Sequence, residues 1–590
     1  MNGDKASINT NYKLKTLDVT GVTTNTSQQS LSSGIINNHS VQNFDRSSFR
    51  QKLDGVYEYR PDTSSSFKIG ADATLKNSKT DDNYITSADN GSNVMLNRSN
   101  RDNTNNNDQK LVDVSGLYTH KFKKPGRTFS FNLATTYEEN HSTGYINSET
   151  DFFNPLGGLD SVAAVHQLKN TATTRTVVNS NTTYSEPLSK TFAVIFNYGL
   201  GVNNEHADTR SYDKSLSGQY DVFNSAFSNN YQFNQLTNQL GAVFNYKKGK
   251  ALVNFGTKAS AVDFTQVDEL TGNVYKRSFI NWTPQASYLY KYSPQKAFRV
   301  DYSGRTTQPT LEQIQPIRVN YNPLFITLGN PNLKASFTNH INVSYNTYGV
   351  VSGQSFYVSG SYNFTTAGIA NNTVTNTLTG KSTTQFINLD KINSNYYLYM
   401  GFNRKINPID INAGINVNAN SNISYGFINN ALNRATSNSY SGRVSVSKYE
   451  EDKYNFDLGA GPGYSINQSS LQLNNTGNAA TFNANSSGSV ELHGGFSVAT
   501  DVDYNYKAKT KTFDAQKTTI WNASVNKTFF KQKNLKLSII ANNLLDQNTN
   551  NNRYASGNTI EQFSSTGIKR YFMFMVTWDF TKFNTIPEKS

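Results

Sequence analysis

The chain has 590 residues, a net charge of +13 and no cysteine, so disulfides, cysteine-ligated zinc and thiol catalysis are excluded. Its mean hydropathy is −0.60, and no apolar stretch reaches the ~18 residues that a transmembrane helix needs. The lysines and arginines are scattered and form neither a basic helix nor an arginine stripe. This distribution argues against nucleic-acid binding; contact with anionic lipid or a simply solvated surface fits it better.

Segments of alternating polarity begin near Ala6 and recur along the whole chain. Because side chains of a strand alternate between two faces, an apolar residue at every second position marks a strand with one oily and one wet side. The apolar faces of three early strands are formed by Ile8, Tyr12 and Leu14, by Leu53, Tyr57 and Tyr59, and by Phe67, Ile69 and Leu75. A transmembrane β-strand needs only ~9–11 such residues, which averaged hydropathy does not detect.

Two kinds of connection alternate between the expected strands. Ten short turns lie near residues 60–64, 123–127, 186–189, 247–250, 293–296, 347–354, 404–408, 449–453, 492–495 and 531–534. Eleven other connections, many of them long, span roughly 20–47, 76–109, 140–171, 203–234, 265–274, 307–337, 366–383, 425–437, 465–477, 507–517 and 548–566. Twenty-one connections join about twenty-two strands, with every long connection at one end. That order is typical of bacterial outer-membrane barrels; a soluble β-solenoid or adhesin is the alternative.

The last strand, residues 571–580, carries Phe572, Phe574, Val576, Trp578 and Phe580 on one face. Such a face suits contact with hydrocarbon, although a core strand of a soluble β protein would look the same. We expect this strand to close the cylinder against the first one. Aromatic residues also gather beside the short turns, where they predict an interfacial girdle, with ordinary strand propensity as the alternative: Tyr57, Tyr59, Tyr118, Phe122, Tyr246, Tyr290, Tyr292 and Phe529.

The sequence therefore predicts an all-β fold: a transmembrane, antiparallel, up-and-down β-barrel of about 22 strands, with short periplasmic turns and long extracellular loops. The barrel is expected over residues 1–580, and 581–590 would form a short periplasmic C-terminal tail. A barrel of this size is too wide for its own side chains to fill. Its lumen face is largely Asn, Ser, Thr, Asp and Lys, which suits water or a polar partner domain.

Motifs for catalysis, metals or cofactors are weak. The seven histidines are widely scattered and are expected as isolated strand or surface residues: His39, His120, His141, His166, His206, His340 and His493. Gly380-Lys-Ser382 has Thr375 where a phosphate-binding loop needs its first glycine, so a plain loop is expected. The glycines of Gly459-x-Gly-Pro-Gly463 share one strand face, where they would leave lumen space or let the strand bend. We expect no enzyme, no cofactor and no metal.

Two motifs carry a family resemblance. Residues 299–316 read RVDYSGRTTQPTLEQIQP and are followed by LGNPNLK at 328–334 and a strand at 339–345; residues 535–546 read LKLSIIANNLLD. A tyrosine-rich strand, a Pro-containing loop, a Gly-Asn-Pro-x-Leu-Lys turn and an Asn-x-Leu-Asp segment in this order resemble the barrel region of TonB-dependent receptors. They most resemble the outer-membrane barrel family common in Bacteroidetes. The specific motifs cover only about residues 280–345 and 535–580.

The resemblance implies energised uptake across the outer membrane of a Gram-negative bacterium. In such receptors the outer loops capture a scarce ligand, an amino-terminal plug domain fills the lumen, and a TonB-type energy-transducing complex pulls a segment before the plug. The expected partners are outer-membrane lipid and lipopolysaccharide, a plug domain, that complex and an unknown small ligand, with no nucleic acid. The longest loops, 76–109, 140–171, 203–234 and 307–337, are the expected contact surface for the ligand.

The amino end departs from the family pattern. No plug-like stretch or motor-binding segment precedes Ala6, and the first residues lack the apolar region of a signal peptide. We expect a fragment that has lost its leader and plug, with a separate plug chain as the other explanation. The function expected is a receptor barrel that imports its ligand when a plug domain completes it. The alternatives are a non-transporting barrel acting as adhesin, structural or assembly partner, and a barrel enzyme with loop-borne residues.

Overall fold

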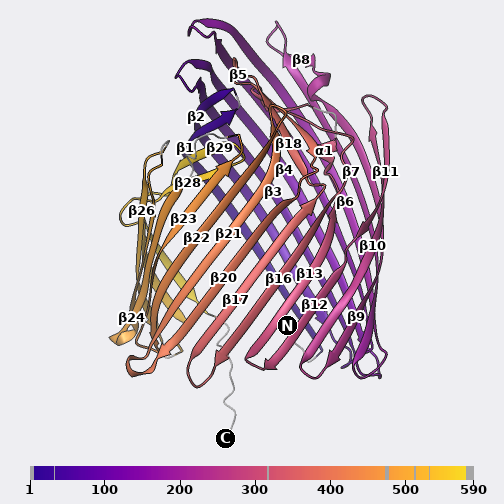
Figure 1. The fold of residues 1–590 in the computed structure, drawn as a ribbon, viewed down its shortest axis with the longest axis vertical. Coiled ribbons are helices and arrows are strands. Elements are labelled where there is room, and N and C mark those ends of the chain that lie inside the picture. The colour runs from indigo at the N-terminus through magenta and orange to yellow at the C-terminus, as the bar shows by residue number, and fades with distance from the viewer. Residues whose placement is uncertain are drawn as a thin grey trace.

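The computed structural model describes residues 5–31, 33–314, 318–471, 478–510, 513–530 and 532–579, which form one sheet of thirty strands. Figure 1 shows the strands side by side around an upright barrel, with tight turns at the lower end and tall hairpins at the upper end. Eight of the thirty described strands are short or lie toward the upper end and are not counted among the main wall strands. The remaining twenty-two confirm the expected strand number and the antiparallel, up-and-down order.

The wall strands follow one another in chain order, each paired antiparallel with the next. They are β1 (Ala6–Leu31), β2 (Gly34–Tyr59), β3 (Ser65–Asn90), β4 (Met95–Lys121), β5 (Thr128–Phe153), β6 (Leu159–Pro187), β7 (Phe192–Lys214), β9 (Asn229–Lys248), β10 (Ala251–Asp268), β12 (Gln285–Ser293), β13 (Lys296–Thr307), β16 (Ser336–Gly349), β17 (Gln354–Thr366), β20 (Asn393–Ile406), β21 (Ile411–Ile428), β22 (Ala431–Glu450), β23 (Tyr454–Ser469), β24 (Ala479–Leu492), β25 (Phe496–Lys507), β26 (Gln516–Phe529), β27 (Leu535–Asn542) and β30 (Tyr571–Trp578).

The eight additional strands lie toward the upper end. β11 (Val274–Trp282) pairs with β10 above β12, and β29 (Thr559–Thr566) precedes β30. The other six are β8 (Tyr220–Phe223), β14 (Arg318–Asn322), β15 (Phe325–Leu328), β18 (Ile369–Thr375), β19 (Ser382–Asn388) and β28 (Thr549–Ser556). Helical structure in the described part of the chain is limited to α1 (Leu311–Ile314) and the 3-10 turns η1 (Ser225–Phe227), η2 (Asn407–Ile409) and η3 (His493–Gly495).

All ten short turns lie where the sequence predicts them, at the lower end in Figure 1. The turn between β2 and β3 shows why so few residues suffice. Asp62 accepts hydrogen bonds of 2.7 Å from the backbone N–H groups of Ser64 and Ser65, so its side chain closes the turn on itself. The bonds from Ser64 lower the pKa of the Asp62 carboxyl, because they favour its charged form.

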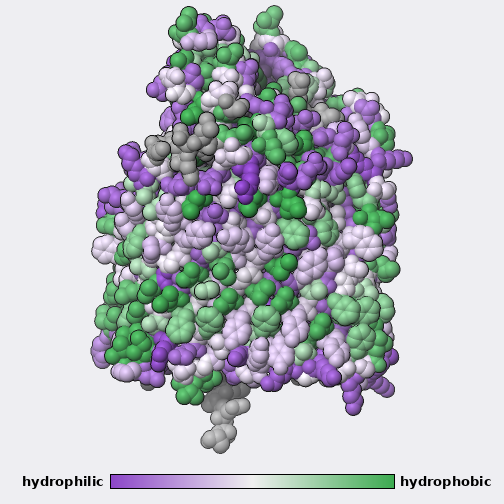
Figure 2. All heavy atoms as spheres, viewed as in Figure 1, coloured by the Kyte–Doolittle hydropathy of each residue, from purple (hydrophilic) through white to green (hydrophobic). Residues whose placement is uncertain are grey.

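The pairing register confirms the predicted division between faces. Tyr57 lies opposite Ile69 and Tyr59 opposite Phe67, so the apolar residues of β2 and β3 share one side of the sheet. On the other side, Lys52 of β2 forms an ion pair with Asp72 of β3. Figure 2 shows the hydrophobic residues gathered over the lower part of the outer surface, below a strongly hydrophilic upper part. The apolar band faces outward, and the polar face lines the lumen.

Aromatic rings run across neighbouring strands at the lower end of this band. The Phe67 ring lies 4.7 Å from Tyr118 and 6.5 Å from Tyr59, measured between centroids, and Tyr118 lies 6.3 Å from Phe129. The predicted girdle positions on β2 and β4 thus form a continuous row with β3 and β5. Their contact with membrane interfaces stays a prediction.

Most residues predicted as long loops are strand, and this is the main correction to the sequence interpretation. Residues 76–109 form the outer halves of β3 and β4, joined by the short connection 91–94. Residues 20–47 and 140–171 are hairpin arms in the same way. The error has a physical cause. Above the membrane a wall strand is polar on both faces, so the alternation in its sequence ends although its hydrogen-bonded ladder continues.

The first and last wall positions meet through β29. Residues 23–29 of β1 pair antiparallel with residues 559–565 of β29, and the Val22 N–H donates to Thr566 Oγ1 at 2.8 Å. β29 is separated from β30 by only four residues, so both occupy the final wall position. The prediction that residues 571–580 close the cylinder against the first strand is wrong for the described residues, because β29 and not β30 pairs with β1, at the upper end. Among the described residues, β30 pairs with β27 alone. Phe580 and the predicted tail 581–590 lie outside the described residues.

The fold predicts how the protein behaves on a gel. A hydrogen-bonded barrel stays compact in detergent until heat breaks its ladder, so unboiled protein should migrate faster than boiled protein. Circular dichroism of the folded form should show strand and almost no helix. A helix-rich spectrum, or identical mobility of both samples, would contradict the barrel.

Candidate functional site

The upper mouth of the barrel is covered by the described parts of two segments, 308–335 (without 315–317) and 367–392, called the cap below. An apolar cluster anchors the cap to the wall. Phe233 of β9 and Phe264 of β10 face the lumen, and Ile314 and Leu333 of the cap pack against them. The two halves of the cap are joined by parallel pairing of β15 with β19. The cap therefore depends on contacts between segments that lie far apart in the sequence.

The Gly-Asn-Pro-x-Leu-Lys motif, residues 329–334, lies where the two segments of the cap meet. Leu333 is 3% exposed within the apolar cluster. The Asn330 side chain donates to the Phe386 carbonyl at 2.8 Å, and the Lys334 N–H donates to Asn388 Oδ1 at 2.7 Å. The motif thus connects the two halves of the cap, a structural role that its sequence does not reveal.

The cap also reaches the opposite side of the mouth. The Asn97 side chain on β4 donates to the Thr379 carbonyl at 2.6 Å, and the Lys381 ammonium lies 4.5 Å from the centre of the Phe152 ring on β5. Gly380 occupies the turn between β18 and β19 with a φ of 71°, a conformation that favours glycine. The Gly380-Lys-Ser382 sequence is therefore a bridging turn, in agreement with its interpretation as a plain loop.

A lumenal cavity of about 490 Å³ lies on the inner face of the outer wall halves, called the wall cavity below. The strand register aligns its lining residues in rows across the sheet, and these rows continue into neighbours that do not line the cavity: Ser78, Gln167, Ser211 and Asp213. The middle row consists of Thr80, Asn105, Gly144, Lys169 and Ser211. The row toward the mouth consists of Asp82, Asn103, Ile146, Gln167 and Asp213, and the row below consists of Ser78, Asn107, Ser142, Thr171, Thr209 and Asn229.

Gly144 makes the floor of the wall cavity concave. It has no side chain between Asn105 and Lys169 in the middle row. A Cβ atom at this position would lie 3.1 Å from Asn105 Oδ1 and 3.2 Å from the Thr104 carbonyl oxygen, both closer than ordinary contact. The position thus accepts only glycine without displacing a neighbour.

Lys169 and Asp82 are the charged residues that line the wall cavity. The Asp82 carboxylate accepts three hydrogen bonds of 2.9–3.2 Å from the Arg46 guanidinium. Lys169 lies eighteen residues before the lower end of β6, well above the ~11 residues that cross the membrane. Burial lowers the pKa of the Lys169 ammonium to about 8, so it carries its charge at neutral pH.

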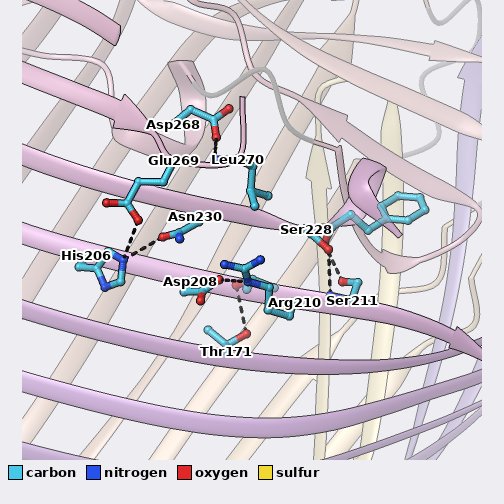
Figure 3. Close-up of polar contacts among 12 residues, drawn as sticks. Thr171, His206, Asp208, Arg210, Ser211, Ser228, Asn230, Asp268, Glu269 and Leu270 are labelled. Carbon is cyan, nitrogen blue, oxygen red and sulfur yellow. Dashed lines mark hydrogen bonds and ion pairs between the residues drawn. The ribbon is translucent and has the colours of Figure 1, made fainter. Parts of the chain in front are cut away.

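Phe227 forms a side of the wall cavity, and buried serines hold it there. Figure 3 shows Ser211 of β7 beside Ser228, where the chain leaves η1. The Ser211 N–H donates to Ser228 Oγ at 2.9 Å, and Ser211 Oγ donates to the Phe227 carbonyl at 2.7 Å. The Phe227 ring centre then lies 5.9 Å from Lys169 Nζ. Because Ser211 is completely buried, the turn that carries the ring is firmly attached to the wall.

The wall cavity lies within the segments that the sequence predicts as the contact surface for a ligand. Every residue that lines the cavity belongs to 76–109, 140–171 or 203–234. The described part of the fourth predicted loop, 307–337, belongs largely to the cap instead. Ligand contact by any of them stays a prediction.

The other residues singled out in the sequence take structural positions. His206 lies 2.8 Å from Asn230 Oδ1 and 3.8 Å from the Glu269 carboxylate (Figure 3). The described part of the chain holds no group of three or more His, Cys, Asp or Glu residues arranged for a metal ion. Gly459 leaves room for the Arg443 side chain, which crosses β23 to bond Asn485, so the expected lumen space is used by a neighbour.

A second cavity, of about 590 Å³, lies beside the seam of the barrel. It is lined by β24, β25 and β26 on one side and by β28, β29 and residues 567–568 on the other. Within the described residues, β28 pairs with β29 and not with β26. This cavity is therefore the space left where the ladder is interrupted, and the wall cavity is the better candidate for a ligand site.

Comparison with known families identifies the barrel. Residues 120–578 match the model of the outer membrane protein beta-barrel family, which covers most of the chain. The chain belongs to this family. It is thus an outer-membrane protein of a Gram-negative bacterium, and its apolar band faces lipid. No curated protein matches the sequence. No helix in the described part of the chain is long and apolar enough to cross a membrane.

Solved structures similar to this outer-membrane barrel include transporters. Unliganded ferric citrate transporter FecA aligns with a TM-score of 0.45 and 12% identity over 94% of this chain and 78% of its own. The copper transporter OprC aligns with a TM-score of 0.45 and 10% identity over 94% of this chain and 80% of its own. The FrpB iron transporter from Neisseria meningitidis aligns with a TM-score of 0.40 and 9% identity over 94% of this chain and 81% of its own.

Proposed function

We propose that the protein is an outer-membrane receptor barrel of the TonB-dependent type. It would bind a small ligand from the cell exterior and import it once a plug domain, in the same chain or in another, fills the lumen. The observation that carries the proposal is the wide twenty-two-position wall with a cavity on its lumenal face and a cap across its mouth. Barrels of this width enclose a plugged lumen rather than a packed core.

The arrangement supports a sequence of steps. A ligand reaches the mouth between the tall hairpins, passes the cap and is held on the polar lumenal face. The cap is attached to the wall by an apolar cluster, by hydrogen bonds and by a short parallel pairing of β18 with β21. These contacts lie outside the antiparallel ladder between wall strands, so the cap can separate from the wall without breaking that ladder. Release to the periplasm would need the plug and a TonB-type energy-transducing complex, which are the proposed partners.

Growth and uptake experiments test this function. A strain that lacks the gene should lose growth on one class among iron chelates, corrinoids and oligosaccharides supplied at limiting concentration, and the intact gene should restore it. Uptake should stop when a protonophore removes the proton gradient. Unchanged growth and uptake on every class, together with loss of surface adhesion or envelope integrity, would refute import and favour the non-transporting barrel.

A further inference from the structure

We propose that the wall cavity binds a hydroxyl-rich small molecule that carries a carboxylate or phosphate, with the anionic group placed at Lys169. This inference names the ligand class of the proposed receptor and rests on that function for its biological meaning. The cavity volume of about 490 Å³ falls in the range of about 300–1,000 Å³ found for small-molecule sites.

The lining of the cavity matches hydroxyl groups. Ten of its sixteen residues are Asn, Ser or Thr, drawn from six strands. An amide offers donors and an acceptor, and a hydroxyl offers both from one atom, so these side chains can satisfy ligand groups that also donate and accept. An apolar ligand would leave these polar groups without partners, which is costly in a shielded site.

The charge at the cavity favours an anion. Asp82 is engaged by Arg46, so it adds little repulsion. Lys169 is the cation on the lining, and its burial strengthens its attraction for an opposite charge because water screens it less. The Arg101 guanidinium lies close by, toward the mouth, 4.3 Å from the centre of the Tyr84 ring.

The aromatic ring at the cavity adds a surface on which a sugar-like ring can pack. Phe227 lines the cavity and is fixed by the buried Ser211 and Ser228 contacts. Because the ring is held in place before any ligand arrives, stacking on it costs little ordering entropy.

Buried polar atoms without partners lie on the mouth side of the wall cavity. Within the described residues, Asn103 Oδ1, Gln167 Oε1 and Arg101 Nε lack hydrogen-bond partners. Asn103 and Gln167 belong to the row of the wall cavity nearest the mouth. Two orphaned acceptors and one donor in a shielded wall indicate that water or ligand groups complete the hydrogen bonding there.

Equilibrium dialysis of the purified full chain in detergent tests the inference with three probes. D-glucuronate and glucose 6-phosphate carry the two candidate anions, and D-glucose is the neutral counterpart of both. At pH 7, at least one anionic sugar should bind at least tenfold more tightly than glucose, since hydrogen bonds to charged groups are roughly twice as strong as neutral ones. The preferred probe distinguishes a carboxylate ligand from a phosphate ligand.

Variants at Lys169 assign the effect to the cavity. Lys169→Met should reduce the affinity for the preferred anionic sugar at least tenfold, to near that of glucose, and Lys169→Arg should retain most of it. Lys214→Met is the matched control. That lysine lies on β7, with its ammonium 6.0 Å from the centre of the Tyr220 ring, but outside the cavity, so binding should not change. Faster migration of unboiled protein confirms that each variant is folded.

Three results would overturn the inference: equal affinity for charged and neutral sugars, no binding of any probe, or equal losses in the Lys169→Met and Lys214→Met variants. The dialysis needs neither a plug nor an energy source. A barrel that binds anionic sugars without importing anything would therefore refute the proposed function alone, and import of a neutral ligand would refute this inference alone.

Binding should also depend on pH. Because the ammonium of Lys169 must be charged to hold an anion, affinity for glucuronate should be complete below pH ~7 and fall as the pH rises through about 8, whereas affinity for glucose should stay constant. The titratable groups on the surrounding lumenal face are Arg46 on β2, Asp82 and Tyr84 on β3, Arg101 on β4, Glu138 on β5, Arg175 on β6, Glu205 and Asp213 on β7, and Tyr231 on β9. The η1 turn contributes none. Constant glucuronate affinity from pH 6.5 to 9 would contradict the role of Lys169.

Discussion

Replacing Phe574 by arginine should destabilise the barrel by about 2–4 kcal/mol, the cost of a cation on the lipid face near the bilayer midplane. Phe574 is the fourth of eight residues in β30, is 66% exposed on the apolar face and lies opposite Ile539 of β27. Arginine there must leave water for hydrocarbon or distort the bilayer to reach water. Denaturant unfolding of the barrel in phospholipid vesicles measures the loss.

Met573→Arg is the matched control for this substitution. Met573 is the preceding residue, points to the opposite face and is 44% exposed toward the lumen. An arginine there remains in contact with water, so its cost should be below ~1 kcal/mol. Equal losses for the two variants would mean that both faces of β30 meet the same medium, and the membrane barrel would be wrong.

Replacing Leu333 by alanine should detach the cap. Leu333 is buried against Phe233, Phe264 and Ile314, and truncation of a buried leucine typically costs 2–5 kcal/mol. The other contacts of the cap with the wall are hydrogen bonds and the short pairing of β18 with β21, which lie outside the ladder between wall strands. The loss should therefore appear as local opening rather than unfolding of the barrel. The mobility difference between boiled and unboiled protein should therefore persist.

The absence of natural cysteines allows the opening to be measured directly. Ser382→Cys places a thiol in β19 of the cap at a position that is 5% exposed, and its reaction with a maleimide reports how often the cap opens. Adding Leu333→Ala should raise the reaction rate at least about tenfold, given the energy above. Leu378→Ala, at a residue of the cap that is 64% exposed, should leave the rate unchanged. Similar maleimide reaction rates of Ser382→Cys with and without the Leu333→Ala substitution would show that this cluster does not hold the cap.

The wall of the barrel could be predicted from the sequence because the membrane imposes a repeating pattern. Lipid on one side and water on the other force apolar and polar residues to alternate with the period of a strand. Leu53, Tyr57 and Ile69 are therefore recognisable as outward-facing without knowledge of their neighbours, and Lys52 and Asp72 as lumenal. The short turns follow from the places where that alternation stops and resumes within a few residues.

The outer hairpins could not be predicted in the same way. Residues 76–109 read as a polar loop because both faces of β3 and β4 meet water or polar groups above the membrane. Their strand conformation is stabilised by hydrogen bonds to β2 and β5, and this lateral pairing leaves no periodic signal in the sequence.

The sequence by itself determined the class of the protein: a wide β-barrel with short turns at one end, long connections at the other, a lipid-facing apolar side and a hydrophilic lumen. Only the tertiary structure decided where a ligand can bind. Successive residues of the row Thr80, Asn105, Gly144 and Lys169 are 25 to 39 positions apart in the sequence, yet the strand register aligns them, and the packing of Leu333 against Phe233 closes the mouth above. The reason is physical: a two-residue period is a local property of each strand, whereas register and cap packing depend on contacts between distant segments.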